Sequence, residues 1–508
     1  MSVSSSTDSL MPDGEERSKL LIGWSEADIT PPQPVIITGM FYARLSEGVS
    51  DPLTATAWAI DSGDDQAVIV SCDLICISDD MREAVLAKLI GKLPGLDPAK
   101  IMLCATHTHS GPETRIRSNA TDHLVGGASG IDLEAMAVAD YVAYAAARIA
   151  EAIEAAWTAR APGGIAYGLG YAVVGNNRRW VNSEGIATMG WVTPALNDTF
   201  RHIEGYEDHT VNVMAIYDAQ DALTGLVVNV PCPSQRGQSE FTISADWWHE
   251  VRSELRRRLG SQLFVLPQCS AAGDQYSFLI YEQKAKLRMM KLQGRTEREE
   301  TAHRIVTAVM EMLPALDGAI ERTTHMRHEV LHADLPAYAL TEEDVRRADA
   351  DAAIWKQTFE QERRKLADQP EQRSYPRWYV EATKAYGRMK WNQAVASRYE
   401  QQQSRASYPA ELHALRLGDV AFATNPFECY LDFGVQMKVR SPATQTFLVQ
   451  LAGSGTYLPS PRSVSGGGYG SVPASNTRSA PKAASKWWSI PSPCCESCGE
   501  KETTANKL

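Results

Sequence analysis

The 508-residue sequence has no run of about 18 or more consecutive apolar residues, so it offers no candidate for a membrane-spanning helix. Its first residues, MSVSSSTDSLMPDGEERSK, have neither a basic start nor an apolar core, which argues against a secretory signal peptide and predicts a disordered leader over residues 1–20. The formal net charge of −12 shows no general excess of positive charge, so we expect neither nucleic acid nor an anionic membrane surface as a partner.

The cysteines show no spacing that would indicate a disulfide framework. Six of the nine stand singly in apolar or site-like stretches, which is typical of reduced thiols, so we expect a cytoplasmic protein. The other three, Cys494, Cys495 and Cys498, contain one C-x-x-C but lack the second pair that a zinc site of this kind needs. The sequence leaves the oligomeric state open.

Short apolar runs alternate with amphipathic stretches along most of the chain. Hydrophobic residues make up 44% of it, enough for a large core. The patterns predict strands at 54–61, 67–74, 100–106, 164–172, 211–218, 225–231, 262–269, within 411–425 and at 445–452, and helices at 81–93, 133–157, 245–259 and 283–312. This succession indicates an α/β fold with a mixed, sandwich-like sheet and flanking helices.

The predicted organisation is one large domain over residues 21–470. A charged, aromatic-bearing stretch at 341–405 reads as a helical insertion before the last strands. Residues 471–508 are rich in Ser and Pro and are predicted to be a disordered tail. The pair Trp487-Trp488 is unusual in such a tail, and one hypothesis is that the tail arises from a shifted reading frame, which the nucleotide sequence would decide.

The most informative stretch is MLCATHTHSGPET, residues 102–114. If the apolar run is a strand, His107 and His109 share one face at its carboxyl end, where open α/β sheets place their ligands. Imidazole is the commonest metal ligand in proteins, and Gly111-Pro112 lets the chain turn away and expose it. Taken alone, an H-x-H is more often a pair of polar loop residues, because a metal site needs three or four converging ligands.

Four segments together resemble the neutral/alkaline non-lysosomal ceramidase superfamily: GWSEADITPP (23–32), SCDL (71–74), ATHTHSGP (105–112) and AAGDQ (271–275). The resemblance runs in order from about residue 22 to 470. It implies a catalytic domain with one zinc ion (Zn2+) per chain, with His107 as a zinc ligand and His109 beside the substrate, handling a proton. It also implies oxygen ligands from Glu428, which follows Pro426-Phe427, and from Tyr457, each at a strand end.

The sequence departs from the family pattern where a second zinc histidine is expected. The matching segment, VVNVPCPSQ (227–235), contains no histidine. Cys232 is the nearest substitute and would bind as a thiolate, while a buried thiol beside a Pro turn is an equal alternative. His249, His202 and His209 are further donors. The sequence leaves open whether the metal has three protein ligands or a substituted fourth one, and whether it is a different metal. The missing histidine also puts ceramide specificity in doubt.

Other positions follow from the same resemblance. Arg178, in Asn176-Asn177-Arg178-Arg179, is a candidate clamp for the substrate, with a surface arginine as the alternative. Asp246 is a further substrate-binding candidate, and Asp274 a catalytic one; either aspartate, like Asp73, could instead orient a histidine ligand. GGGYG (466–470) has no following Lys-Ser/Thr, which favours a flexible flap over a phosphate cradle.

The expected function is that of a zinc-dependent hydrolase of the neutral ceramidase type, an amidase in sphingolipid metabolism that cleaves the N-acyl bond of a small-molecule or lipid-like substrate with metal-activated water. One alternative is a metal-dependent hydrolase of glycosidic or ester bonds in a small polar substrate. Another is a catalytically inactive binding protein on the same scaffold. The insertion bears on this choice, because its aromatic residues could be core or could line a pocket for a compact polar substrate: Trp355, Trp378, Tyr379, Tyr386 and Trp391.

Overall fold

The computed structural model describes residues 19–116, 124–190, 198–475 and 477–484. Most of the predicted leader lies outside these residues, as do Trp487, Trp488 and the three cysteines of the tail. The reading-frame hypothesis therefore stays a prediction. Within the described ranges, no helix is both long and apolar enough to span a bilayer.

An eight-stranded sheet with the order β14-β13-β12-β7-β1-β4-β5-β6 forms the centre of the molecule. The pairs β5/β6 and β13/β14 are parallel and the other pairs are antiparallel, so the sheet is mixed as predicted. Its strands are β1 (Leu21–Asp28), β4 (Thr54–Asp61), β5 (Gln66–Cys72), β6 (Ile101–Ala105), β7 (Ala161–Tyr171), β12 (Thr210–Asp218), β13 (Leu223–Val230) and β14 (Phe264–Cys269).

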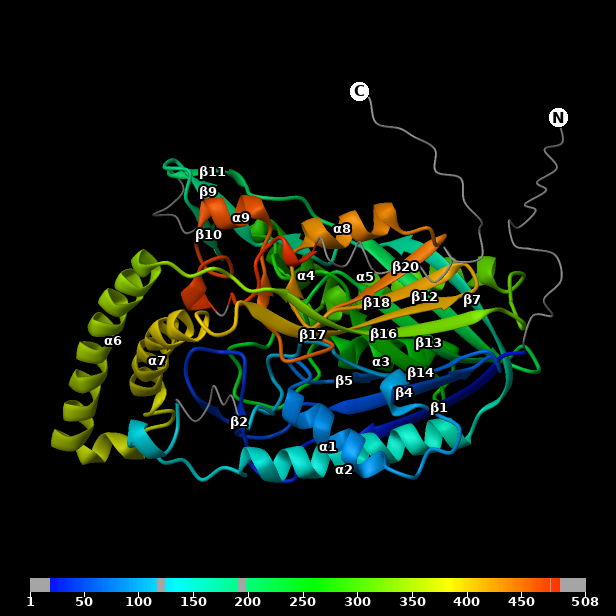
Figure 1. Cartoon of the computed structure of the whole chain (residues 1–508), viewed down its shortest axis with the longest axis horizontal. Helices are drawn as coiled ribbons and strands as arrows, with labels where there is room; N and C mark the ends of the chain where they lie inside the picture. Colours follow the sequence, from blue (N-terminus) through cyan, green and yellow to red (C-terminus); the bar gives the residue numbers. More distant parts are fainter. Residues whose placement is uncertain (1–18, 117–123, 191–197, 476, 485–508) are drawn as a thin grey trace.

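A second sheet packs face to face on the first (Figure 1). It has the order β16-β17-β18-β20, with the strands β16 (Met326–Pro336), β17 (Ser407–Leu417), β18 (Val420–Thr424) and β20 (Gln445–Val449). Between the sheets, the Phe422 ring lies 4.7 Å from that of Phe447 and 6.3 Å from that of Trp58, centroid to centroid. The predicted sandwich-like α/β architecture is confirmed.

Helices cover the other face of the large sheet. They are α1 (Asp79–Leu89), α2 (Val138–Thr158), α3 (Trp247–Leu259) and α5 (Glu297–Leu316). Successive side chains of a strand point to opposite faces of the sheet, so one strand packs against both the helices and the second sheet. On β5, Val68 and Val70 pack against the helices, whereas Ile69 between them packs toward the second sheet.

The structure corrects one predicted helix. Residues 283–312 were expected to form one helix, but they belong to two, α4 (Gln283–Gln293) and α5. Gly294 ends α4 with a φ of 65°, a left-handed conformation that glycine adopts without steric cost. Thr296 then starts α5 through a capping box with Glu299. The glycine is a signal for the end of a helix, and Thr-x-x-Glu is a signal for the start of the next one. The local sequence therefore indicated this break.

The predicted insertion forms a helical hairpin between β16 and β17. Its helices are α6 (Glu342–Asp368) and α7 (Val380–Gln401), and Figure 1 shows them at one end of the molecule. Four of its five aromatic residues pack within or beneath the hairpin, whereas Trp391 lines the pocket described below.

Part of the predicted tail packs on this hairpin. Arg398 of α7 donates hydrogen bonds to the carbonyl oxygens of Pro473 (2.8 Å) and Thr477 (2.6 Å). Ser479 is buried and forms an isolated bridge with Ala337. The chain therefore borders the insertion from Pro473 to Thr477, whereas Ala483 and Ala484, at the end of the described residues, pack against residues of β16 and β17.

Several short elements complete the fold around one end of the sheets. They are β2 (Ile36–Ile37), β3 (Arg44–Leu45), β8 (Asn176–Asn177), β9 (Arg179–Asn182), β10 (Ala187–Met189), β11 (Phe200–Ile203), β15 (Gln275–Tyr276), β19 (Glu428–Cys429), β21 (Tyr457–Leu458), α8 (Leu431–Arg440) and α9 (Pro461–Gly466).

Replacement of Phe422 by alanine should destabilise the protein strongly, because it removes a fully buried ring from the layer between the sheets. We expect the free energy of unfolding to fall by about 3–5 kcal/mol in a denaturant titration. Val439→Ala, at a side chain that is 79% exposed, is the matched control and should have little effect. Equal effects of the two substitutions would contradict the two-sheet packing.

A buried histidine pair predicts a pH dependence of stability. His328 Nε2 lies 3.0 Å from His413 Nδ1, and burial, reinforced by His413, lowers the pKa of His328 to about 3. The unfolded chain, with a histidine pKa of about 6.5, then binds this proton more readily than the folded chain. Stability from this group is therefore present above about pH 6.5 and is lost as the pH falls toward 3.

His328→Gln tests this dependence, since an amide can hydrogen-bond there but does not titrate. Between pH 7 and 5 the thermal midpoint of the wild type should fall further than that of the variant. Parallel pH curves for the two proteins would show that His328 does not contribute the effect.

Candidate functional site

Four of the predicted site residues meet at a small pocket between the strand ends and the helical hairpin. The cavity has a volume of about 90 Å3, and its walls include His107, His109, Glu428, Tyr457, Tyr469 and Trp391. The first four were predicted from the sequence, and the last two come from the glycine-rich segment and from α7.

His107 is held so that one ring nitrogen faces the cavity. It follows β6 and has a φ of 66°, an uncommon conformation for a residue with a side chain. Its Nδ1 lies 2.7 Å from the carbonyl oxygen of Ile75, which can only accept a proton. In the neutral ring, Nε2 therefore carries the lone pair, and it lies 3.5 Å from Oε2 of Glu428.

Two chain segments about thirty residues apart bring Glu428 and Tyr457 together. They lie in β19 and β21, which pair in parallel with Glu428 opposite Tyr457. Burial alone would raise the pKa of Glu428, but a proton on His107 Nε2, followed by Arg178 and the Tyr457 hydroxyl, lowers this pKa below its ordinary value. Burial, and then the nearby Glu428 carboxylate, raise the pKa of Tyr457 well above its ordinary value. The site thus contains an ionised carboxylate beside a neutral phenol.

His109 lies beside His107 and is kept neutral. The two Nε2 atoms are 3.3 Å apart, and the amide nitrogen of Gln235 lies 3.4 Å from Nδ1 of His109. Burial, followed by His107 and two nearby guanidinium groups, lowers the pKa of His109 well below its ordinary value. Arg44 Nη2 donates a 2.5 Å hydrogen bond to the His109 carbonyl oxygen and so fixes the backbone here.

Arg178 enters the site from the other side. Its Nη2 donates to the Gly273 carbonyl oxygen at 2.9 Å and to the Tyr457 hydroxyl at 3.3 Å. Its Nη1 lies 3.5 Å from Oε1 of Gln235. The side chain is 92% buried, since 8% of it is exposed, so its charge acts on Tyr457 and Glu428 with little screening by water. The predicted substrate clamp is therefore a fixed cation that is hydrogen-bonded to Tyr457, a residue of the pocket wall.

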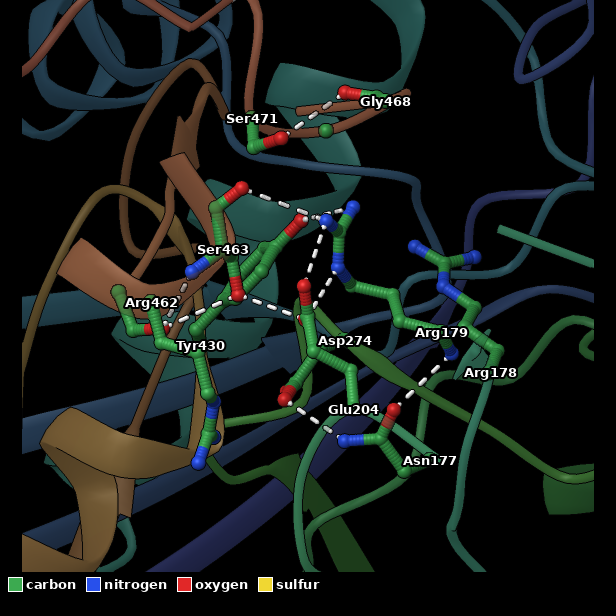
Figure 2. Close-up of polar contacts among 12 residues, drawn as sticks. Asn177, Arg178, Arg179, Glu204, Asp274, Tyr430, Arg462, Ser463, Gly468 and Ser471 are labelled. Atoms are coloured by element: carbon green, nitrogen blue, oxygen red, sulfur yellow. Dashed lines mark hydrogen bonds and ion pairs between the residues drawn. The ribbon is translucent and has the colours of Figure 1, made fainter. Parts of the chain in front are cut away.

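Asp274 joins three of the segments that build the site. Its Oδ1 accepts a hydrogen bond from the Leu431 amide at 3.0 Å, and its Oδ2 accepts one from the Asn177 side chain at 3.1 Å (Figure 2). Its own carbonyl accepts from the Arg178 amide at 2.9 Å. Burial raises the pKa of Asp274 to about 6. Asp274 was expected to be catalytic. In the structure, its hydrogen bonds position Arg178 and the segment after Glu428.

Gly273 explains how closely these segments approach. A Cβ atom at this position would lie 2.4 Å from the Glu428 carbonyl oxygen, and the Gly273 amide donates to the Cys429 carbonyl at 2.8 Å. Only glycine fits there without displacing β19. The glycine of AAGDQ is thus required by the close packing of backbone behind Glu428.

The glycine-rich segment, predicted as a flap, delivers Tyr469 to the pocket. Arg179 donates to the carbonyl oxygens of Tyr469 and Gly467, each at 2.7 Å, and its charge is paired with the buried Glu204 (Figure 2). The Tyr469 ring lies 5.5 Å from that of Tyr457. The segment is thereby tied to Arg179, the first residue of β9 and the neighbour of Arg178.

Cys232, the nearest substitute for the missing histidine, lies in the core beneath the pocket. It packs with Val230 and Trp247 under α3, its thiol points to the Pro233 carbonyl, and burial raises its pKa well above the ordinary value. The residue of this segment that reaches the site is Gln235, three positions later. The segment in which a second histidine was expected therefore presents an amide to His109.

Asp246 lies at the start of α3. It caps the helix through a 2.7 Å hydrogen bond from the Trp247 amide and accepts another from the Gly237 amide at 2.6 Å. It thereby holds the loop that carries Gln235. Asp73 accepts two hydrogen bonds from Arg252 and one from Thr106, so it supports the end of β6 just before His107.

The other histidines considered as donors contact groups outside the pocket. His249 lies within α3 and is half-buried. His202 is exposed on β11, and His209 lies 3.4 Å from Glu207.

Among the residues in or next to the pocket that were not singled out from the sequence are five with polar side chains. Gln235 lies in the segment where a histidine was expected, and Tyr469 lies in the glycine-rich segment. The sequence around each of these two residues therefore pointed to the site. The remaining three come from stretches whose role only the tertiary contacts reveal: Arg44, Glu113 and Arg115.

The described part of the chain has no group of three or more His, Cys, Asp or Glu side chains arranged as a metal site. The converging donors here include only two of those residue types, His107 and Glu428, with the third oxygen coming from a tyrosine. Phenolate oxygen is an uncommon but chemically competent ligand for a divalent cation.

Residues 20–179 match the family model described as neutral/alkaline non-lysosomal ceramidase, N-terminal. The structure titled "Ceramidase complexed with C2" superposes with a TM-score of 0.62 at 15% identity, covering 93% of this chain and 74% of that one. A neutral ceramidase from Pseudomonas aeruginosa gives a TM-score of 0.60 at 15% identity, with coverages of 93% and 73%. No curated protein matches the sequence. The resemblance predicted from the motifs is confirmed, and at this identity the two structures share the fold.

Asp274→Ala should destabilise the protein and loosen the site, because the Asn177 amide and the Leu431 N–H would lose their buried acceptor. We expect the free energy of unfolding to fall by about 2–4 kcal/mol in a denaturant titration. Asp432→Ala, which removes a more exposed carboxylate paired with Arg462, is the control and should cost less than about 1 kcal/mol. If the two variants were equally stable, Asp274 would not organise the site.

Proposed function

We propose that this protein is a zinc-dependent hydrolase of the neutral ceramidase type that cleaves an amide (N-acyl) bond. The observation that carries the proposal is the meeting of His107, Glu428 and Tyr457, from distant parts of the chain, at one pocket. The match of residues 20–179 to the ceramidase family and the shared fold support the reaction class.

The chemistry of the donors fits a bound cation. The lone pair of His107 Nε2 faces the Glu428 carboxylate at 3.5 Å, and two acceptors at that separation repel unless a proton or a cation lies between them. Ligands about 2.0–2.2 Å from a tetrahedral zinc ion lie roughly 3.4 Å from one another, close to the observed spacing. His107, Glu428 and Tyr457 would hold the ion as three protein ligands.

A zinc ion held there would supply Lewis acidity and an activated water. The chain's own groups define the rest of the chemistry. Arg178 places a fixed positive charge beside Tyr457 and Glu428, where it would stabilise negative charge that develops on the substrate oxygen. His109 is neutral, so it offers one N–H to an oxyanion or to the leaving amine and one lone pair to a proton.

The proposed substrate is an N-acyl compound, lipid-like or small, and the proposed setting is sphingolipid metabolism in the cytoplasm. The support is the likeness to ceramidases for the bond, and the scattered single cysteines of the sequence for the location. The helical hairpin restricts which substrates fit the site, because Trp391 forms an aromatic wall of a cavity of about 90 Å3.

Metal content tests the ligand assignment. After loading with zinc and removal of excess metal, the wild type should retain about one zinc ion per chain by elemental analysis, whereas His107→Ala should retain much less. His109→Ala should keep the metal but lose about 100-fold or more in turnover of N-acyl substrates.

Cys232→Ser is the matched control, since its thiol lies in the core and the substitution should leave the zinc content unchanged. Equal zinc content in the wild type and His107→Ala would contradict the metal site. Zinc binding without hydrolysis of any N-acyl amide, but with hydrolysis of glycosides or esters, would replace the amidase by the alternative hydrolase.

A further inference from the structure

The helix α4 has an exposed side that the proposed function does not use. The chain reaches this helix from β15, where the Tyr276 hydroxyl donates a 3.0 Å hydrogen bond to the Gln235 carbonyl. Lys286 and Met290 lie on the inner side of the helix. Lys286 Nζ donates to the Ser277 carbonyl at 3.3 Å, and Met290 is buried. The opposite side of α4 faces solvent.

Large apolar side chains gather on this outer side. Leu287, Met289 and Leu292 of α4, together with Tyr281 just before it, are each between 48% and 64% exposed. Single exposed apolar residues are normal on a protein surface, but several within one short segment mark an interaction site. The outer side of α4 is therefore a candidate docking surface.

The same side of the helix is strongly basic. Residues 283–295, QKAKLRMMKLQGR, contain five Lys or Arg and no Asp or Glu, in a chain whose formal net charge is −12. Lys284, Arg288 and Lys291 are exposed, and none of them forms an ion pair with a carboxylate of the described residues. The expectation that no anionic surface is a partner came from the charge of the whole chain, which does not describe this segment.

The apolar and basic side chains of α4 form two separate strips. The apolar strip recurs at i, i+4 and i+7: Ala285, Met289 and Leu292. The basic strip has the same spacing, one position earlier: Lys284, Arg288 and Lys291. Residues at this spacing share one side of an α-helix, and a shift by one residue turns that side by about 100°. An apolar strip therefore runs beside a basic strip, and both point away from Met290.

We propose that α4 docks the protein on an anionic lipid bilayer. The apolar strip would enter the boundary between headgroups and acyl chains, and the basic strip would pair with the lipid phosphates and carboxylates. The exposed Tyr281 beside the helix has an amphipathic ring that suits the same depth. This docking does not depend on the reaction at the pocket.

The arrangement of α4 favours a bilayer over other partners. Nucleic acid would pair with the basic strip but would leave Met289 and Leu292 in water. A second copy docked through its own α4 would bring two basic strips together. A protein groove that encloses a helix would require α4 to give up the contacts of Met290 and Lys286. A flat surface contacts the outer side alone.

Sedimentation of the full chain with vesicles tests the proposal. The wild type should bind vesicles of equal parts phosphatidylcholine and phosphatidylserine far more tightly than vesicles of phosphatidylcholine, and added salt should weaken this binding. The triple variant Lys284→Gln/Arg288→Gln/Lys291→Gln should lower the partition coefficient roughly 100-fold, because each basic residue near an anionic bilayer contributes roughly fivefold. Met289→Gln/Leu292→Gln should lower it by about 10-fold.

Helix α6 supplies matched controls for both variants. Arg346→Gln/Arg347→Gln/Lys356→Gln removes three positive charges from exposed positions of α6, and Ile354→Gln removes an exposed apolar side chain there. Both controls should bind the anionic vesicles as the wild type does. Because every substituted side chain is exposed, all variants should keep the thermal midpoint of the wild type. The comparison of the two vesicle types and of salt concentrations needs no variant.

Several results would overturn the proposal. One is wild-type binding that is absent or equal for the two vesicle types, and another is an equal loss in the α4 and α6 charge variants. Tighter binding to duplex DNA than to the anionic vesicles, unaffected by Met289→Gln/Leu292→Gln, would assign the basic strip to nucleic acid. A wild-type dimer that these two substitutions dissociate, without vesicle binding, would assign the face to a second copy. None of these readouts involves hydrolysis, so they leave the proposed function untouched.

Discussion

The orientation of the His107 ring is the constraint on which the site depends. One hydrogen bond, from Nδ1 to the Ile75 carbonyl, settles which nitrogen carries the proton and turns the lone pair of Nε2 toward Glu428. A positive φ at His107 makes this orientation possible directly after β6. Rotation of the ring would leave the Glu428 carboxylate facing no nitrogen and would separate the donors that we assign to the metal.

Backbone contacts between distant segments then place the other groups around that nitrogen. Glu428 and Tyr457 are neighbours because β19 and β21 pair in parallel, and Gly273 packs so closely behind β19 that a side chain would not fit. Asp274 connects this backbone to Arg178, which lies between β8 and β9. The polar centre is therefore held by buried hydrogen bonds, while the helical hairpin supplies an apolar wall through Gly387 and Trp391.

The fold and half of the site were predictable from local pattern. Apolar runs followed by polar residues identified His107 at the end of β6, and the ceramidase-like order of motifs identified Glu428 and Tyr457. Local pattern failed where a turn decides which side chain reaches the pocket: the chain after β13 buries Cys232 and presents Gln235 instead. Tyr469 and Gly387 reach the pocket because of how the glycine-rich segment and the hairpin pack on the rest of the fold, which local periodicity does not predict.

The central claim is that a nitrogen of His107 and oxygens of Glu428 and Tyr457 bind one zinc ion. X-ray absorption at the zinc edge of the loaded protein tests this claim most directly, because it distinguishes nitrogen and oxygen ligands from sulfur. The account predicts a shell of nitrogen and oxygen atoms at about 2.0–2.2 Å with imidazole scattering, which His107→Ala abolishes. A zinc–sulfur distance of about 2.3 Å, or an unchanged spectrum in His107→Ala, would contradict it.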